Sequence, residues 1–131
     1  MTHFEFLIPR RPLSLQAKNT RLQSWKAFVR AEAAKGWKGS MLDRDLHLTL
    51  VYLYDESPPD LDNIIKPIQD ALVGLVLIDD SQVADVEGHR RPLKGIFDLT
   101  SLPPHVIEGV TLQKECVYVR VSHSEALEVY P

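Results

Sequence analysis

The sequence contains a single cysteine and no long hydrophobic segment. One cysteine, Cys116, excludes an internal disulfide and a cysteine-ligated zinc cluster. Since it lies in the apolar stretch ECVYVRVS, we expect it in the core. The longest apolar run, ALVGLVLI, is too short to cross a bilayer, and the start MTHFEFLIPRRP does not resemble a signal peptide. We therefore expect a soluble, cytoplasmic protein with no membrane partner.

The chain also lacks internal repeats, low-complexity segments and a glycine-rich phosphate-binding loop. Its 131 residues, 44% hydrophobic and 25% charged, are typical of one globular domain, which we expect to span residues 1–131.

Charge is distributed unevenly along the chain. Residues 1–44 hold nine Lys/Arg and three Asp/Glu, a net charge of +6. Residues 45–131 hold six Lys/Arg and fifteen Asp/Glu, a net charge of −9. A basic surface beside an acidic one is suited to bind a polyanion and a cation, respectively. The alternative is that both segments are simply solvated surfaces.

Hydrophobic patterning predicts four strands and three helices. We expect the strands in HFEFLI, DLHLTLVYLY, SQVADVEGHRR and ECVYVRVSH. We expect a first helix in NTRLQSWKAFVRAEAAKG, capped by Asn19 or Thr20. A second helix is expected from about Asp62 to Val73, where Gly74 stops it, and a third in LPPHVIEGVTLQK. Because these elements interleave without a regular βαβ repeat, the predicted fold class is α+β, with a small mixed β-sheet packed against two or three helices.

The segment PDLDNIIKPIQDALVGLVLIDDSQVADV gathers several carboxylates around one lysine, Lys66. In an extended chain Asp60 and Asp62 would point to the same side, about 6–7 Å apart. Asp62 is also placed to cap the following helix, with Asn63 as the alternative. Pro67 lies beyond the first turn, where it is expected to distort the helix.

Clustered carboxylates suit Mg²⁺, which takes oxygen ligands and can polarise a phosphoryl oxygen or activate water. The pair Asp79 and Asp80 can supply a third carboxylate if the chain folds back. Lys66 can then stabilise charge on a phosphate. The segment therefore indicates metal-assisted phosphodiester hydrolysis. The alternative is that these acids are helix caps and turn residues.

The pattern DLDNIIKPIQDAL…DDSQV resembles the signature of the RusA family of Holliday-junction resolvases, D-x-D-N-x-x-K, D-A-L and D-D-x-Q-V. The resemblance implies a small homodimeric, Mg²⁺-dependent endodeoxyribonuclease that makes paired symmetric nicks in four-way DNA, with Mn²⁺ able to substitute for Mg²⁺. It implies Asp60, Asp62 and Asp80 as metal ligands and Lys66 as the catalytic lysine. Asp79, Asp70 and Asn63 are then supporting residues.

A junction resolvase must also bind DNA, and we expect basic residues outside the motif to do so, because affinity for DNA comes largely from neutralising its phosphates. The predicted DNA-binding residues are Arg10, Arg11, Lys18, Arg21, Arg90 and Arg91. Three alternatives stay open: a nuclease of the same chemistry for flaps or forks, a junction-binding protein without turnover, and a small nucleotide phosphohydrolase.

Overall fold

Four strands form one mixed sheet in the order β1-β4-β2-β3. The computed structural model describes residues 2–129. The strands are β1 (Thr2–Ile8), β2 (Leu46–Tyr54), β3 (Val83–Pro92) and β4 (Cys116–His123), and the helices are α1 (Asn19–Gly36), α2 (Leu61–Leu72) and α3 (Pro104–Leu112). β4 pairs antiparallel with β1 and β2, whereas β2 and β3 are parallel. The α+β fold with a small mixed sheet is therefore confirmed.

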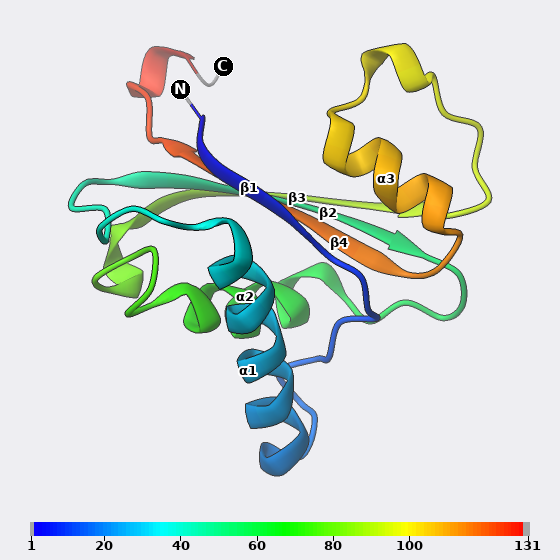
Figure 1. Ribbon diagram of the computed structural model, residues 1–131, viewed down its shortest axis with the longest axis horizontal. Coiled ribbons are helices and arrows are strands. Elements are labelled where there is room, and N and C mark those ends of the chain that lie inside the picture. Colours follow the sequence, from blue (N-terminus) through cyan, green and yellow to red (C-terminus); the bar gives the residue numbers. More distant parts are fainter. Residues whose placement is uncertain (1, 130–131) are drawn as a thin grey trace.

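The helices cover the sheet on both faces, with α1 and α2 on one side and α3 on the other (Figure 1). The main core lies between the sheet and the first two helices. The α1 contribution to this core is the stripe predicted from helical spacing, which consists of Leu22, Trp25, Val29 and Ala33. On the other face, Cys116 is fully buried in a smaller cluster with Leu53 and Leu93, as expected for a core cysteine.

The start of α1 differs from the prediction. Its N-cap is Lys18, and no side chain caps the helix. Asn19 and Thr20 already lie inside the first turn, because the chain turns helical one residue earlier than a cap at Asn19 would require. Burial of the apolar stripe stabilises this helix in place of a cap.

The α2 helix provides the crossover that parallel strands require, running from the end of β2 toward the start of β3. It begins at Leu61 with Asp60 as N-cap, so the prediction of Asp62 or Asn63 as the cap was wrong. For the same reason Asp62 is helical, and Asp60 and Asp62 do not project from one extended segment. The helix ends at Leu72, and Gly74, with φ of +85°, makes the predicted stop.

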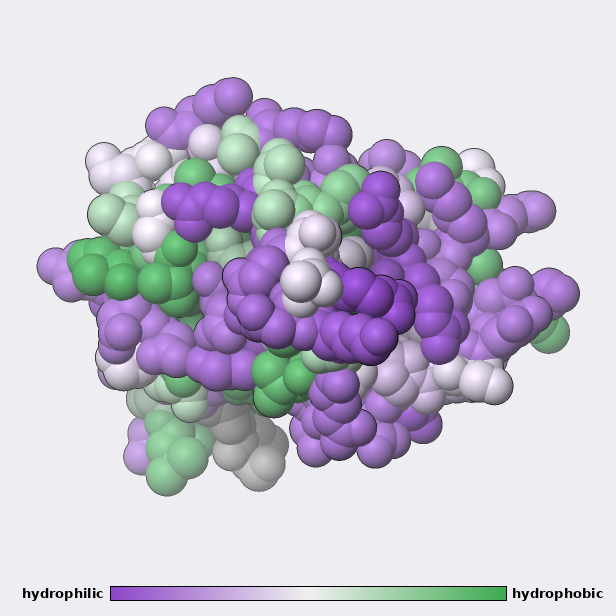
Figure 2. Space-filling model, turned by 90° about the horizontal axis from the view of Figure 1, so that it is seen from below, coloured by the Kyte–Doolittle hydropathy of each residue, from purple (hydrophilic) through white to green (hydrophobic). Residues whose placement is uncertain are grey.

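Seen from the side of α1 and α2, the surface is largely hydrophilic, with hydrophobic patches scattered between charged side chains (Figure 2). In residues 2–129, no helix combines the length and the apolar character needed to cross a membrane.

Candidate active site

Asp60 and Asp62 lie at the amino end of α2, just after the turn that follows β2. Both are exposed, and neither carboxylate forms a hydrogen bond or ion pair with another described residue. Asp62 lies in the first turn, where the partial positive charge of the helix end stabilises a carboxylate. These two acids are therefore available to an external cation.

Lys66 follows Asp62 by one helical turn and contacts two further acids of the motif. Its Nζ lies 2.5 Å from Asp80 Oδ2 and 2.9 Å from Asp70 Oδ1. Hydrogen bonds to Asp80 and then to Asp70 raise the pKa of the Lys66 ammonium group, which therefore stays charged at neutral pH. Asp70 also lies 3.5 Å from Lys26 Nζ of α1, so it joins the two helices.

The adjacent acids Asp79 and Asp80 have different environments. Asp79 is the N-cap of a short 3₁₀ helix, η1 (Asp80–Gln82), and its carboxylate accepts hydrogen bonds from the backbone and hydroxyl of Ser81. These bonds lower the pKa of the Asp79 carboxyl. Asp80 instead faces Lys66. Of the two, Asp80 thus lies beside the α2 side chains of the motif, and Asp79 shapes the turn.

Gln82 fixes this turn to the rest of the fold. Its Oε1 accepts from the amides of Ile78 and Asp79 at 2.8 and 2.9 Å. Its Nε2 donates to the carbonyls of Leu42 and Arg44 at 2.8 and 3.0 Å. One side chain therefore holds the Asp80 turn against the segment that leads into β2.

A second set of contacts holds the turn before Asp60. Arg11 donates to the carbonyls of Glu56 and Ser57, each at 2.8 Å, and pairs with Glu115 at 2.9 Å. Glu115 also accepts from the hydroxyl of buried Tyr52 at 2.7 Å. Burial raises the pKa of Glu115, but its hydrogen bonds outweigh this and lower it. From the other side, Arg90 lies 3.4 Å from the Pro59 carbonyl.

Glu115 and Tyr52 were not among the predicted site residues, because no local pattern in the sequence links residues 11, 52 and 115. Gln82 was visible as part of the motif, but its four hydrogen bonds depend on where the chain before β2 lies. These residues act by positioning the acids.

The donor chemistry of the site fits a hard divalent cation. Asp60 and Asp62 offer carboxylate oxygens that have no partner among residues 2–129, and Asp80 adds a third carboxylate beside Lys66. Within residues 2–129, however, no three His, Cys, Asp or Glu side chains are close enough together to hold a metal ion. Asp80 is paired with Lys66, and the three carboxylates do not form such a group, so binding one ion with all three requires side chains to rearrange.

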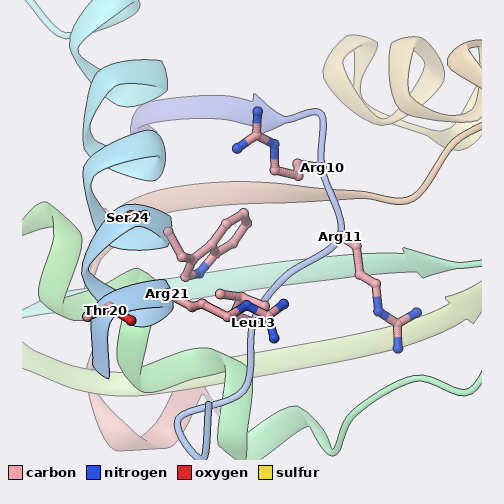
Figure 3. Close-up of a pocket in the computed structure, with 7 residues that line it drawn as sticks. Arg10, Arg11, Leu13, Thr20, Arg21 and Ser24 are labelled. Atoms are coloured by element: carbon pink, nitrogen blue, oxygen red, sulfur yellow. The ribbon is translucent and has the colours of Figure 1, made fainter. Parts of the chain in front are cut away.

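The six predicted DNA-binding residues lie in different settings. Arg10, Arg11 and Arg21 line one pocket between the loop after β1 and the α1 helix (Figure 3). Lys18 precedes α1, and exposed Arg90 and Arg91 lie near the end of β3. The charge of Arg11 is already paired with Glu115, whereas Arg10 stacks 3.7 Å above the Phe28 ring.

Comparison with known proteins agrees with the motif. The family model described as endodeoxyribonuclease RusA matches residues 14–95, which run from the loop before α1 to just beyond β3. No significant match was found among curated proteins. The family match covers more than half of the 131 residues and includes Lys66 and the five aspartates of the motif, Asp60, Asp62, Asp70, Asp79 and Asp80. The chain therefore belongs to the RusA family of endodeoxyribonucleases, the Holliday-junction resolvases that its D-x-D-N-x-x-K motif indicated.

Proposed function

We propose that this protein is a Mg²⁺-dependent endonuclease that resolves Holliday junctions by paired symmetric nicks, with Mn²⁺ able to replace Mg²⁺. The observation that carries the proposal is the grouping of Asp60 and Asp62, which have no partner among residues 2–129, with Lys66, which lies one helical turn after Asp62 and contacts Asp80. Symmetric nicking of a four-way junction needs two active sites, so the proposed active form is a homodimer.

Asp60, Asp62 and Asp80 are the proposed metal ligands. A bound Mg²⁺ would act there as a Lewis acid toward the phosphodiester and lower the pKa of a coordinated water. Lys66, charged at neutral pH, is the proposed electrostatic partner of the phosphate. Asp70 lies 2.9 Å from Lys66 Nζ, so it would continue to hold the ammonium group if Asp80 were a metal ligand.

Arg90 and the basic loop after β1 are the proposed contacts to the DNA backbone. Arg90 is suited to this role because it lies next to Pro59, one residue before Asp60. These contacts position the DNA and do not by themselves select a sequence.

The test is cleavage of an end-labelled synthetic four-way junction with Mg²⁺, Mn²⁺ or EDTA. We expect paired symmetric nicks with either metal and none with EDTA. Asp60→Asn and Asp62→Asn should each lower the rate at least about 100-fold, because loss of metal charge stabilisation costs several kcal/mol. Asp43→Asn is the matched control, since Asp43 is exposed and lies outside the motif.

Flap and fork substrates in the same assay separate the proposed activity from cleavage of other branched DNA. If flaps were cut faster than four-way junctions, the flap and not the junction would be the substrate of this enzyme. Tight junction binding with no nicks in either metal would refute catalysis and assign the acids to caps and turns. Sedimentation of the free and junction-bound protein tests the homodimer.

A further inference from the structure

A pocket of about 490 Å³ opens between the loop after β1 and the amino-terminal half of α1. Its volume lies within the roughly 300–1,000 Å³ typical of small-molecule sites. Figure 3 shows that Arg10 reaches from the loop toward α1 and Arg21 from α1 toward the loop, while Arg11 points away. The lining residues are Arg10, Arg11, Leu13, Thr20, Arg21, Ser24 and Trp25.

Two of the three arginines that line the pocket, Arg10 and Arg21, present positive charge without a compensating acid. No Asp or Glu lines it, and neither Arg10 nor Arg21 pairs with a carboxylate of residues 2–129. The first turn of α1 contains no acidic residue and has no side-chain cap, so its amide groups add to the positive potential. Such a group of donors favours an anion, and a phosphate in particular.

The other residues that line the pocket favour a ligand larger than an inorganic anion. Leu13 supplies an apolar surface, and Thr20 and Ser24 add hydroxyl groups. Trp25 also lines the pocket, but it is only 3% exposed and its indole Nε1 is shielded from solvent, so it backs the wall and offers no face for stacking. A ligand with one anionic end and one apolar end that carries hydrogen-bonding groups matches this combination, as a nucleotide does.

The pocket is also connected to the candidate active site. Two residues after Leu13, the amide of Leu15 donates at 2.8 Å to the carbonyl of Asn63, the residue that follows Asp62. The loop that forms one wall of the pocket is thus fixed to the first turn of α2.

We propose that this pocket binds one unpaired nucleotide of a branched DNA substrate, with its phosphate against Arg10 and Arg21 and its base against Leu13. The expectation that the pocket binds a free nucleotide depends on the pocket alone. The expectation that this nucleotide belongs to branched DNA rests on the proposed function. The pocket then favours branch points, where bases are unstacked, over continuous duplex.

The first test uses Trp25 as a reporter in a Trp37→Phe background, titrated with deoxycytidine 5′-monophosphate, deoxycytidine and inorganic phosphate. We expect a saturable change in emission with the nucleotide, and binding at least about tenfold weaker for deoxycytidine and for phosphate. Arg21→Gln should weaken nucleotide binding about tenfold or more. Lys38→Gln removes the same charge outside the pocket and should change nothing.

Three results would overturn the proposed nucleotide pocket. The first is no saturable change up to about 10 mM nucleotide. The second is equal affinity for phosphate and nucleotide, which would reduce the pocket to an anion site. Equal weakening by Lys38→Gln and Arg21→Gln would also refute it, because the effect would then be one of net charge.

A second test places the fluorescent base 2-aminopurine at positions around the branch of a four-way junction. Emission should rise at one position on binding of the wild-type protein and not of Arg21→Gln at saturating concentration. Uniformly quenched emission would overturn the role in branched DNA. Junction cleavage without nucleotide binding refutes only the pocket, whereas nucleotide binding without cleavage of any branched DNA refutes only the proposed function.

Discussion

The amide of Leu15 donates a hydrogen bond of 2.8 Å to the carbonyl of Asn63, and Pro67 is the reason that this carbonyl is available. In a regular helix the Asn63 carbonyl accepts from the amide four residues later, but proline has no N–H. The residue expected to weaken the helix instead creates the docking point for the loop that precedes α1. The buried proline ring packs within an uninterrupted α2.

Replacing this proline tests the relationship. Pro67→Ala restores a helical donor that competes for the Asn63 carbonyl, so the Leu15 amide should exchange with solvent at least several-fold faster. Hydrogen exchange followed by NMR measures this. Pro104→Ala is the control, because a proline in the first turn of a helix leaves no carbonyl without its partner. An unchanged Leu15 rate would show that the loop is held by other contacts.

The Lys66–Asp80 pair predicts a pH dependence. Because the pKa of Lys66 is raised in the folded protein, its contribution to stability is complete below the ordinary value of 10.5 and is lost as pH rises through the raised pKa. Asp80→Asn should lower the Lys66 pKa, measured by NMR titration of the ammonium group, while Asp70 keeps part of the shift. The stability change should stay below about 1 kcal/mol, because the pair is exposed to solvent. A Lys66 pKa that is unchanged in Asp80→Asn contradicts the pairing.

Gln82 should matter for stability out of proportion to its size. Gln82→Ala removes four hydrogen bonds and should lower the free energy of unfolding by about 1–3 kcal/mol, measured by urea denaturation. Gln82→Glu keeps the acceptor but places a second oxygen against the Leu42 and Arg44 carbonyls, so it should also destabilise the fold. A neutral Gln82→Glu would mean that the two carbonyl contacts contribute little.

The contacts of Glu115 predict sensitivity to its removal and to acid. Glu115→Ala leaves the buried Tyr52 hydroxyl without its acceptor and should cost about 1–3 kcal/mol, whereas exposed Glu108→Ala should stay within about 0.5 kcal/mol. Since the pKa of Glu115 is lowered, its contribution is present above its ordinary value of 4.5 and is lost as pH falls through the lowered pKa. Urea denaturation at pH 7 and pH 3 measures both effects. The difference between wild type and Glu115→Ala should shrink at the lower pH.

Much of the local structure followed from neighbouring residues. The helical spacing of Leu22, Trp25, Val29 and Ala33 gave the buried face of α1, and Gly74 gave the stop after α2. The order D-x-D-N-x-x-K, D-A-L, D-D-x-Q-V identified the family, because the motif lies within 24 consecutive residues, 60–83. These inferences needed only periodicity, backbone preference and residue type.

The helix caps were predicted less well, because a cap depends on where the chain first turns helical. Asp60 was expected in an extended segment with Asp62, yet the helix begins between them at Leu61. Lys18 precedes α1 without a side-chain cap, although Asn19 and Thr20 are both good capping residues. Burial of the apolar face set these boundaries, and burial is a property of the packed protein.

The sequence by itself determined the strands and helices, the α+β class and the set of acids around Lys66. Only the tertiary structure decided that Asp80, and not Asp79, faces Lys66, that Arg11 is held by Glu115, and that a carbonyl freed by Pro67 anchors the loop at Leu15. The physical reason is the distance along the sequence over which each interaction acts. Helical periodicity and glycine stops act within one or two turns, whereas these contacts join residues up to 104 positions apart and exist only after the sheet has brought its strands together.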